Sequence, residues 1–385
     1  MHIAINGLFL QRPFTGTGQY TIRLLSELPR LGKSHRYTLL GGSAQSRQNA
    51  FVAGFHSRGA SPRMDGRYHD LQKVLWEQLG LPLHAASSGA DILHNPYWAS
   101  PVCSLQRTVV TIHDVIPALL PAYRGRILTR TYTSLVALSA RRADAIIADS
   151  DCTRRDIVRV LRIPASRVHT IHLAPGERFY PMPAVDAREI VRRRWSIDQP
   201  FFVYIGATDR RKDIPTLLRA WQQTSVRLPG HLLVLGGSTP PHSGPLYPDL
   251  PRMAEELRVS HRVRFIGAVD DEGHRALLSA CDAFVFPSLY EGFGLPPLEA
   301  MASGAPVIAA AASSVPEVVG NAALLFPPGE VGALSDAMLR LAGDPLLRAS
   351  ARNAGIRQAG TFTWEKTAAQ TLGVYEAVMD CRRRS

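Results

Sequence analysis

Two carboxylates, Glu291 and Glu299, stand out in this sequence by their type and spacing. They lie eight residues apart in the stretch SLYEGFGLPPLEAM, on either side of Pro296-Pro297. Proline in the first turn of a helix loses no backbone hydrogen bond, so the stretch predicts a helix that begins at these prolines and carries Glu299, with Glu291 in the loop before it. Carboxylates so placed can accept hydrogen bonds from sugar hydroxyls. The alternative is an ordinary strand–helix crossover with two solvated glutamates.

The loop between the two carboxylates supplies backbone donors. Phe293, Gly294 and Leu295 can turn their amides towards a ligand because Gly292 and Gly294 permit unusual φ angles. The free N–H groups and the positive dipole end of the helix start suit a phosphate. The segment therefore favours a ligand that has both phosphate and sugar hydroxyl groups.

Further candidates follow predicted strands in the first half of the chain. His113 ends one strand, where it can hydrogen-bond a sugar hydroxyl or stabilise developing charge, or serve as a structural histidine. Gly16 and Gly18 precede a helix expected from about Gln19, and they permit close backbone approach to a diphosphate or form a plain turn. Thr21 stands where a third glycine would complete a dinucleotide-binding fingerprint, so that fingerprint is absent.

The elements that must position these residues alternate between strand and helix. Short apolar runs predict twelve strands, at residues 2–5, 37–40, 91–94, 108–113, 145–149, 168–172, 201–207, 232–237, 263–268, 283–288, 306–310 and 323–326. Helical patterns between them are typical of parallel sheets, whose ligands bind at the carboxyl ends of the strands. We expect two doubly wound α/β domains, 1–175 and 195–362, joined by a linker, 176–194. A C-terminal helix within 363–385 can pack on either domain.

Composition excludes several classes of protein. The 385 residues are 45% hydrophobic and 20% charged, which is globular usage, and no apolar run reaches the roughly 18 residues of a membrane span. No basic leader precedes the first apolar stretch, so no signal peptide is expected. The four cysteines are far apart, which disfavours a disulfide framework or a zinc site.

The net charge of +12 is concentrated in one half of the chain. Residues 1–180 hold 22 Lys and Arg against 11 Asp and Glu, whereas residues 181–385 hold 22 against 21. The asymmetry favours contact of the first half with a polyanion or an anionic membrane surface, or it reflects solubility in an arginine-rich chain. Nucleic-acid binding is disfavoured because the arginines are scattered without interleaved aromatic residues.

The motifs resemble those of retaining glycosyltransferase family 4, whose fold is GT-B. The likeness is strongest in EGFGLPPLEAMASGAPVIA, 291–309, and continues through SSVPEVVGNAALLFPPGE, YIGATDRRKDIPTLLRAW, TIHDVIP and GTGQYTIRLL. It thus extends over nearly the whole chain. The resemblance implies a fold of two Rossmann-like domains that face each other across a cleft, and an enzyme that transfers a sugar from a nucleotide-sugar donor with retained anomeric configuration.

The resemblance also implies roles for particular residues of the second domain. Glu291 is expected to contact the donor sugar, and Glu299 the ribose. Arg211 and Lys212 are expected to hold the diphosphate, with Arg211 replacing the arginine of the commoner Gly-Arg-Leu form because Ala207 follows Gly206. The remaining donor-site residues are expected to act through backbone groups, and they are Phe293, Gly294, Leu295, Gly206, Gly236, Ile266 and Gly267. The base is expected near Gly236, Ile266 and Gly267.

In the first domain, the resemblance places His113 beside the donor sugar and Gly16 and Gly18 beside its diphosphate. His94 and Asn95 are expected to shape the acceptor side.

Asp149-Ser150-Asp151 has the DxD pattern that holds a metal in other glycosyltransferases. It follows a predicted strand and precedes a predicted helix, so a strand end and a helix cap explain it, and this interpretation is preferred. No metal and no other cofactor are expected.

Within the family, HDVIPALLPAYRG, ATDRRKD and SLYEGFGLPPLEAM look most like bacterial mannosyltransferases of surface-polysaccharide assembly. GDP-mannose is therefore the first donor and UDP-glucose the second, with a glycan or lipid-linked acceptor. A sugar-nucleotide epimerase or hydrolase of the same fold is the alternative, and a nucleic-acid-binding protein a remote one. We expect a cytoplasmic protein, peripheral on the inner face of the cell membrane when its acceptor is lipid-linked.

The expected membrane contact lies in the segment from residue 47 to residue 76. Its cations and interspersed apolar residues are Arg47, Arg58, Arg63, Arg67, Lys73, Phe51, Phe55, Leu71, Leu75 and Trp76. An amphipathic interfacial segment has this composition, but so does a segment that packs against the sheet.

Overall fold

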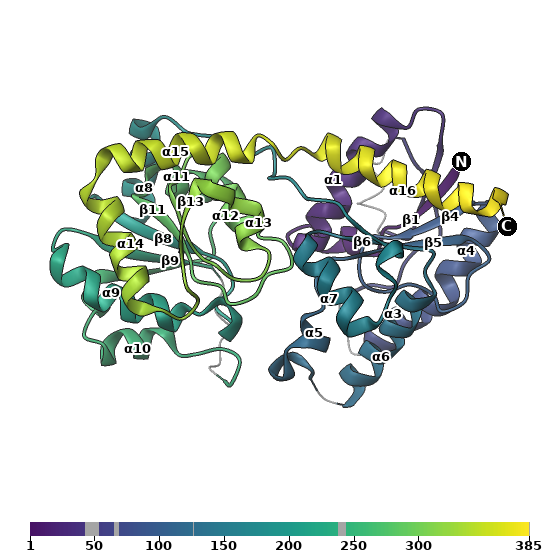
Figure 1. The fold of residues 1–385 in the computed structure, drawn as a ribbon, viewed down its shortest axis with the longest axis horizontal. Coiled ribbons are helices and arrows are strands. Elements are labelled where there is room, and N and C mark those ends of the chain that lie inside the picture. The colour runs from purple at the N-terminus through teal and green to yellow at the C-terminus, as the bar shows by residue number, and fades with distance from the viewer. Residues whose placement is uncertain (43–53, 65–68, 126, 238–243, 385) are drawn as a thin grey trace. The chain divides into compact units, whose positions relative to one another are not determined.

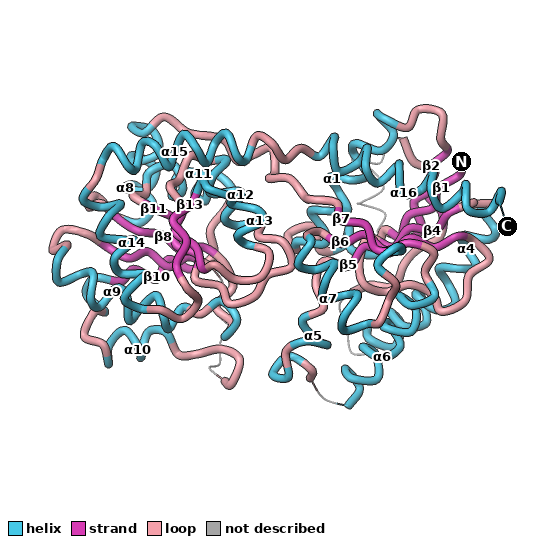
Figure 2. The backbone as a smooth tube through the Cα atoms, in the orientation of Figure 1, coloured by secondary structure: helices cyan, strands magenta, loops and turns pink. Residues whose placement is uncertain are grey.

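The computed structural model describes residues 1–42, 54–64, 69–125, 127–237 and 244–384, which form two units (Figures 1 and 2). The first unit comprises Met1–Leu173 with Thr363–Ser385, and the second comprises Ala174–Phe362. Each is an α/β domain built on one parallel sheet, which confirms the predicted fold class. No helix in the described ranges is both long enough and apolar enough to cross a membrane.

The sheet of the first unit has seven parallel strands in the order β3-β2-β1-β4-β5-β6-β7. Their bounds are β1 His2–Asn6, β2 Arg36–Leu40, β3 His56–Arg58, β4 Ile92–Asn95, β5 Arg107–Ile112, β6 Ala145–Ala148 and β7 Val168–Thr170. Six were predicted, because strands covered on both faces read as apolar runs. The edge strand β3 was not, because its three residues are polar and exposed.

Helices cover this sheet, and their bounds are α1 Gly16–Leu31, α3 His69–Leu75, α4 Leu81–Ser88, α5 Ile116–Leu119, α6 Ile127–Arg142, α7 Asp151–Leu161 and α16 Trp364–Arg384. A π-helical turn, Trp76–Gly80, joins α3 and α4 into one continuous helix. Helix α1 begins three residues before its expected start because Thr15 caps it: Gly18 N donates a hydrogen bond to Thr15 Oγ1 at 3.1 Å.

The C-terminal helix α16 belongs to the first unit and packs beside α1 (Figure 1). Tyr375 is fully buried, and its hydroxyl lies 2.6 Å from His94 Nδ1. The other ring nitrogen of His94 lies 2.9 Å from Thr111 Oγ1 on β5. Burial lowers the pKa of His94 to about 3, so the ring is neutral and structural.

His94 and Asn95, which are expected to shape the acceptor side, present no side-chain surface to a ligand in this structure. Neither residue is exposed at all. Asn95 accepts a hydrogen bond from Asn6 and donates one to Ser100. Both side chains make their hydrogen bonds within the unit, because a polar group at the end of a buried strand must find its partners inside the protein.

The second unit has a six-stranded parallel sheet in the order β10-β9-β8-β11-β12-β13. All six strands were predicted: β8 Phe201–Ile205, β9 Leu232–Gly236, β10 Val263–Gly267, β11 Ala283–Phe286, β12 Val307–Ala310 and β13 Ala323–Phe326. The helices are α8 Ala184–Trp195, α9 Ile214–Arg227, α10 Leu250–Glu256, α11 Asp271–Ala280, α12 Leu295–Ala302, α13 Val315–Val319, α14 Val331–Gly343 and α15 Pro345–Ala359.

The strand order of the second unit reverses between β8 and β11. The chain continues from β8 towards β9 on one side and from β11 towards β12 on the other. The loops that leave these two neighbouring strands diverge at the carboxyl edge of the sheet, which is where doubly wound sheets bind ligands. The fold thereby places the loop that carries Lys212 against the loop that carries Glu291.

Candidate active site

The loops after β8 and β11 bring together three of the four charged side chains that the sequence singled out in the second unit. Lys212 Nζ lies 2.6 Å from Glu291 Oε1, and Arg211 Nη1 lies 2.8 Å from Glu291 Oε2. Ser288 Oγ also donates to Glu291 Oε1, at 2.5 Å. Residues 79 positions apart in sequence thus form one hydrogen-bonded ion cluster.

Burial and charge determine the ionisation of this cluster. Lys212 and Glu291 are only 7% and 9% exposed. Burial raises the pKa of the Glu291 carboxyl, but the charges of Lys212 and Arg211 lower it by more than burial raises it. The net pKa is therefore below its usual value, and Glu291 is ionised. A second carboxylate, Asp209 Oδ1, lies 3.5 Å from Arg211 Nε. Two cations and two carboxylates therefore balance one another in the unliganded protein.

Serines that the sequence analysis missed hold the loop of Glu291 in shape. Glu291 N donates to Ser313 Oγ at 2.7 Å, and Ser314 Oγ donates to the carbonyl oxygens of Glu291 and Phe293 at 3.0 and 2.5 Å. Both serines follow β12, the neighbour of β11, so they reach the same sheet edge. Their position after a predicted strand was the signal that could have revealed them.

Helix α12 begins at Leu295 and carries Glu299, as predicted. Gly294 precedes it with φ of 120°, a conformation that favours glycine, and prolines occupy the first turn. Glu299 does not join the Glu291 cluster, and its carboxylate has no hydrogen-bond or ion-pair partner in the described part of the chain. Burial raises the pKa of Glu299 to about 7, against the opposing charge of Arg178.

A cavity of about 430 Å³ lies at the carboxyl ends of β8, β9 and β10. The expected glycines Gly236 and Gly267 line it, whereas Ile266 lies behind Gly236 and is not in the lining. The full lining is Tyr204, Thr208, Ile214, Leu235, Gly236, Gly237, Leu250, Pro251, Phe265, Gly267 and Ala268. Thr208 Oγ1 is buried there without a hydrogen-bond partner in the described ranges, so it is available to a ligand.

Glycine is required where these three loops meet. Gly206 N donates to Gly236 O at 3.0 Å, and Gly237 N donates to Gly267 O at 2.7 Å. Gly237 has φ of 130°, and a Cβ there would lie 1.9 Å from Gly206 O. Gly206 and Gly236 were expected in the donor site but Gly237 was not, although the second glycine of LLVLGG marks it.

In the first unit, Gly16 and Gly18 play different parts at the start of α1. A Cβ on Gly18 would lie 2.1 Å from Arg12 O, so the close turn before the helix requires glycine there. Gly16 is the first residue of the helix, and a Cβ on it would meet no atom within 4 Å. The helix start at Gly16 is thus open to an anionic group.

His113 and Asp149 meet at the carboxyl edge of the first sheet. His113 Nδ1 lies 2.7 Å from Asp149 Oδ2, and Nε2 lies 3.1 Å from Pro96 O. Ser150 is the cap of α7, as expected, because Thr153 N donates to its hydroxyl at 3.0 Å. The strand-end and cap interpretation was incomplete for Asp149, whose side chain binds a histidine. No group of three or more potential metal ligands occurs among the described residues.

The segment expected to face a membrane is only partly suited to it. Arg47, Phe51 and Arg67 lie outside the described residues. Trp76 is 6% exposed and belongs to the core, so it is wrongly included in that surface. Lys73 is not a free surface cation either, because its ammonium lies 4.7 Å from the centre of the Tyr132 ring and 3.8 Å from Glu77 Oε1.

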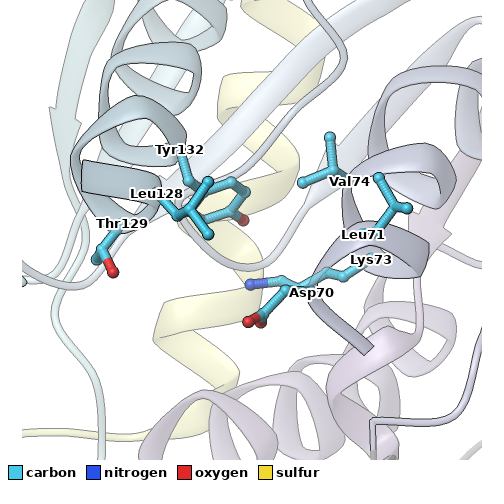
Figure 3. A pocket seen from close by; sticks show the side chains of 7 residues that line it. All are labelled: Asp70, Leu71, Lys73, Val74, Leu128, Thr129 and Tyr132. Carbon is cyan, nitrogen blue, oxygen red and sulfur yellow. The ribbon is translucent and has the colours of Figure 1, made fainter. Parts of the chain in front are cut away.

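Exposed leucines instead form a stripe along the continuous helix of α3 and α4. Leu71, Leu75, Leu79 and Leu83 follow one another at intervals of four residues and are 49–68% exposed. A cavity of about 490 Å³ separates α3 from the start of α6, where Leu128 is 85% exposed (Figure 3). We call these five leucines the leucine stripe.

Two doubly wound domains, one with a nucleotide-sized cavity beside a cluster of cations, define a glycosyltransferase of the GT-B fold. The model of glycosyltransferase family 4 matches residues 14–174, and that of glycosyl transferases group 1 matches residues 187–358. The chain is 32% identical to O-antigen chain mannosyltransferase B of Escherichia coli over 380 residues. The aligned region covers 95% of this chain and 97% of the relative. The chain belongs to this glycosyltransferase family, which confirms the predicted family and enzyme class.

Solved structures show the same fold at lower identity. Sucrose-phosphate synthase from Thermosynechococcus elongatus has a TM-score of 0.74 and 22% identity, covering 99% of this chain and 100% of its own. HepE of Anabaena, in complex with UDP and glucose, has a TM-score of 0.71 and 16% identity, covering 97% and 99%. These likenesses confirm the GT-B architecture.

Proposed function

We propose that this enzyme transfers mannose from GDP-mannose to a glycan or lipid-linked acceptor in the assembly of a bacterial surface polysaccharide, with retained configuration. The observation that carries the proposal is the buried cluster of Arg211, Lys212 and Glu291 at the carboxyl ends of β8 and β11. The identity to a mannosyltransferase of O-antigen chains supports the choice of sugar and pathway.

The cluster suits the departure of a diphosphate. Cleavage of the bond between the sugar and the diphosphate builds negative charge on the leaving oxygens, and fixed cations in a water-poor site stabilise it. Without donor, Glu291 and Asp209 neutralise Arg211 and Lys212. When the diphosphate takes over these cations, Glu291 is released to accept hydrogen bonds from sugar hydroxyls. The reaction then needs no metal or other cofactor.

The nucleoside is assigned to the glycine-lined cavity at the ends of β8, β9 and β10. Close backbone approach at Gly206 and Gly237 makes room for a flat base, and Thr208 Oγ1 offers it a hydrogen bond. Glu299 is assigned to the ribose, whose two hydroxyls can donate to its carboxylate.

A donor panel tests the proposal. GDP-mannose is expected to raise the melting temperature more than UDP-glucose or other nucleotide sugars, because a ligand that binds only the folded state stabilises it. With an octyl α-mannoside as acceptor, GDP-mannose should yield a longer mannoside. Stabilisation by UDP-glucose alone would overturn the choice of donor. Free mannose without an acceptor product would indicate a hydrolase.

The proposal includes peripheral contact of the first unit with the inner face of the cell membrane when the acceptor is lipid-linked. The leucine stripe supplies the apolar side of that contact, and Arg58 and Arg63 are exposed cations of the same unit. Exposed apolar side chains of this kind insert into the headgroup boundary, while each cation near an anionic leaflet contributes on the order of 1 kcal/mol.

Vesicle sedimentation tests the contact. The protein should bind vesicles with phosphatidylglycerol at low salt, less at high salt, and less after Leu71→Ser, Leu75→Ser and Leu79→Ser are combined. Leu346→Ser is the matched control, because Leu346 is 82% exposed and lies on α15 of the second unit. No sedimentation with anionic vesicles at low salt would contradict the membrane contact and favour a soluble acceptor.

A further inference from the structure

Asp149, which is buried, and His113, which is partly exposed, form a pair that the roles assigned above do not explain. Strands β5 and β6 are neighbours, and each of these two residues follows its strand at the carboxyl edge. The parallel register therefore brings them together, with His113 Nδ1 2.7 Å from Asp149 Oδ2. Asp149 is 2% exposed, and its Oδ1 has no hydrogen-bond partner in the described ranges. The histidine is thus the one group seen to compensate this carboxylate.

The second nitrogen of the ring determines its protonation state. His113 Nε2 lies 3.1 Å from the carbonyl oxygen of Pro96. A carbonyl oxygen only accepts hydrogen bonds, and so does an ionised carboxylate. Both ring nitrogens must then carry hydrogen, and the ring is an imidazolium. A buried carboxylate with a single partner is stable when that partner is a cation.

We propose that Asp149 is a positioning residue of the transfer reaction, which fixes the ring of His113 and holds it as an imidazolium. In this state His113 has no lone pair, so it cannot remove a proton from the acceptor hydroxyl. It acts instead as a fixed positive charge, because both of its N–H groups already donate to Asp149 and to the carbonyl of Pro96. The inference rests on the proposed function in one respect, namely that His113 contacts the donor sugar.

The surroundings of His113 agree with this state. Burial by itself lowers the pKa of His113, but the charge and hydrogen bond of Asp149, then the carbonyl of Pro96 and the charge of Asp114, raise it above its usual value. From β4, His94 faces it as a neutral ring. From α1, the ring of Tyr20 meets it edge-on at 4.9 Å, and burial raises the pKa of Tyr20, which is neutral.

The other aspartate of the motif provides a matched control. Asp151 Oδ1 accepts a hydrogen bond from Thr170 Oγ1 of β7 at 2.6 Å. Asp149→Asn keeps the size of the side chain and removes its charge, whereas Asp151→Asn makes the same change two residues away. Asp149→Glu restores the charge on a longer arm.

The test combines a titration with kinetics. In protein labelled with ¹⁵N-histidine, with His113 assigned by the His113→Gln variant, both ring nitrogens should be protonated at pH 7. Asp149→Asn should shift the titration of His113 to lower pH by at least one unit, and Asp151→Asn should not. In transfer assays, Asp149→Asn should lower kcat at least tenfold with donor KM within twofold. The activity of Asp149→Asn should begin to fall at a lower pH than that of the wild type. Asp149→Glu should recover part of the rate.

Each failure has its own meaning. A neutral His113 ring at pH 7 in the wild-type protein, measured without donor, overturns the inference whichever sugar is transferred and even if the Asp149 variants do not fold. An unchanged titration in folded Asp149→Asn overturns it as well. A shifted titration with unchanged kcat overturns the role of Asp149 in the reaction. The donor panel decides the proposed donor independently of these results.

Discussion

Replacing Glu291 by glutamine is expected to destabilise the second unit as well as to slow the reaction. The substitution keeps the shape of the side chain but removes the charge that Lys212 Nζ meets at 2.6 Å and Arg211 Nη1 at 2.8 Å. Lys212 is 7% exposed, so its ammonium would stay buried without its nearest counter-charge. Breaking a buried pair in this way costs about 3–5 kcal/mol.

The lower end of that range applies here, because the glutamine oxygen can still accept one hydrogen bond and Asp209 remains beside Arg211. For a unit of this size, each kcal/mol lowers the Tm by roughly 2–4 °C, so the expected loss is about 6–12 °C. A bound diphosphate would replace the missing anion, so saturating GDP should reduce the loss by more than half. Transfer should slow at least tenfold, since one such contact contributes ~2–4 kcal/mol in the transition state.

Calorimetry with and without GDP, together with initial rates, measures these effects. Glu330→Gln is the control, because Glu330 is an exposed glutamate of the same unit without a capping hydrogen bond. A wild-type Tm and rate in Glu291→Gln would refute the assignment of the cluster. An equal loss of Tm with and without GDP would refute the exchange of carboxylate for diphosphate.

Three other outcomes are expected. The pKa of Glu299 is about 7, and its ionised carboxylate accepts hydrogen bonds from the ribose, so donor affinity should rise about tenfold from pH 6 to pH 8. Titration calorimetry measures this affinity, and the Glu299→Gln variant should show no such rise. Gly237→Ala should abolish stabilisation by nucleotide, because its Cβ would meet Gly206 O at 1.9 Å; Gly332→Ala, whose Cβ meets nothing within 4 Å, should bind normally. Activity should persist in EDTA, and loss restored by manganese would revive the DxD interpretation of Asp149.

Most of the fold could be predicted from the sequence, because buried parallel strands read as apolar runs. All twelve predicted strands are present, and the prolines before Glu299 open α12 as expected. The edge strand β3 could not be found this way, since an exposed three-residue strand has no apolar signature. Trp76 was misplaced because a local pattern does not reveal which side of a helix meets the core.

The sequence could propose which residues form the donor site, but it could not predict the contacts between their side chains. The motifs marked Lys212 and Glu291 for separate roles on a ligand, whereas in the unliganded protein they bind each other. That pairing depends on the reversal of strand order between β8 and β11, which no local spacing encodes. The hydrogen bond between His113 and Asp149 likewise depends on strand order, because it forms only when β5 and β6 are adjacent in the sheet.

The return of α16 to the first unit has a consequence for biosynthesis. The second unit is one continuous stretch, Ala174–Phe362, whereas the first is completed only by Thr363–Ser385, which is synthesised after the whole second unit. Until then His94 lacks the hydroxyl of Tyr375, and the sheet lacks the helix that covers it. The usual order, in which the amino-terminal domain folds first, is therefore reversed for completion of the native state. A released chain that ends before residue 363 would contain the complete second unit and lack the last helix of the first.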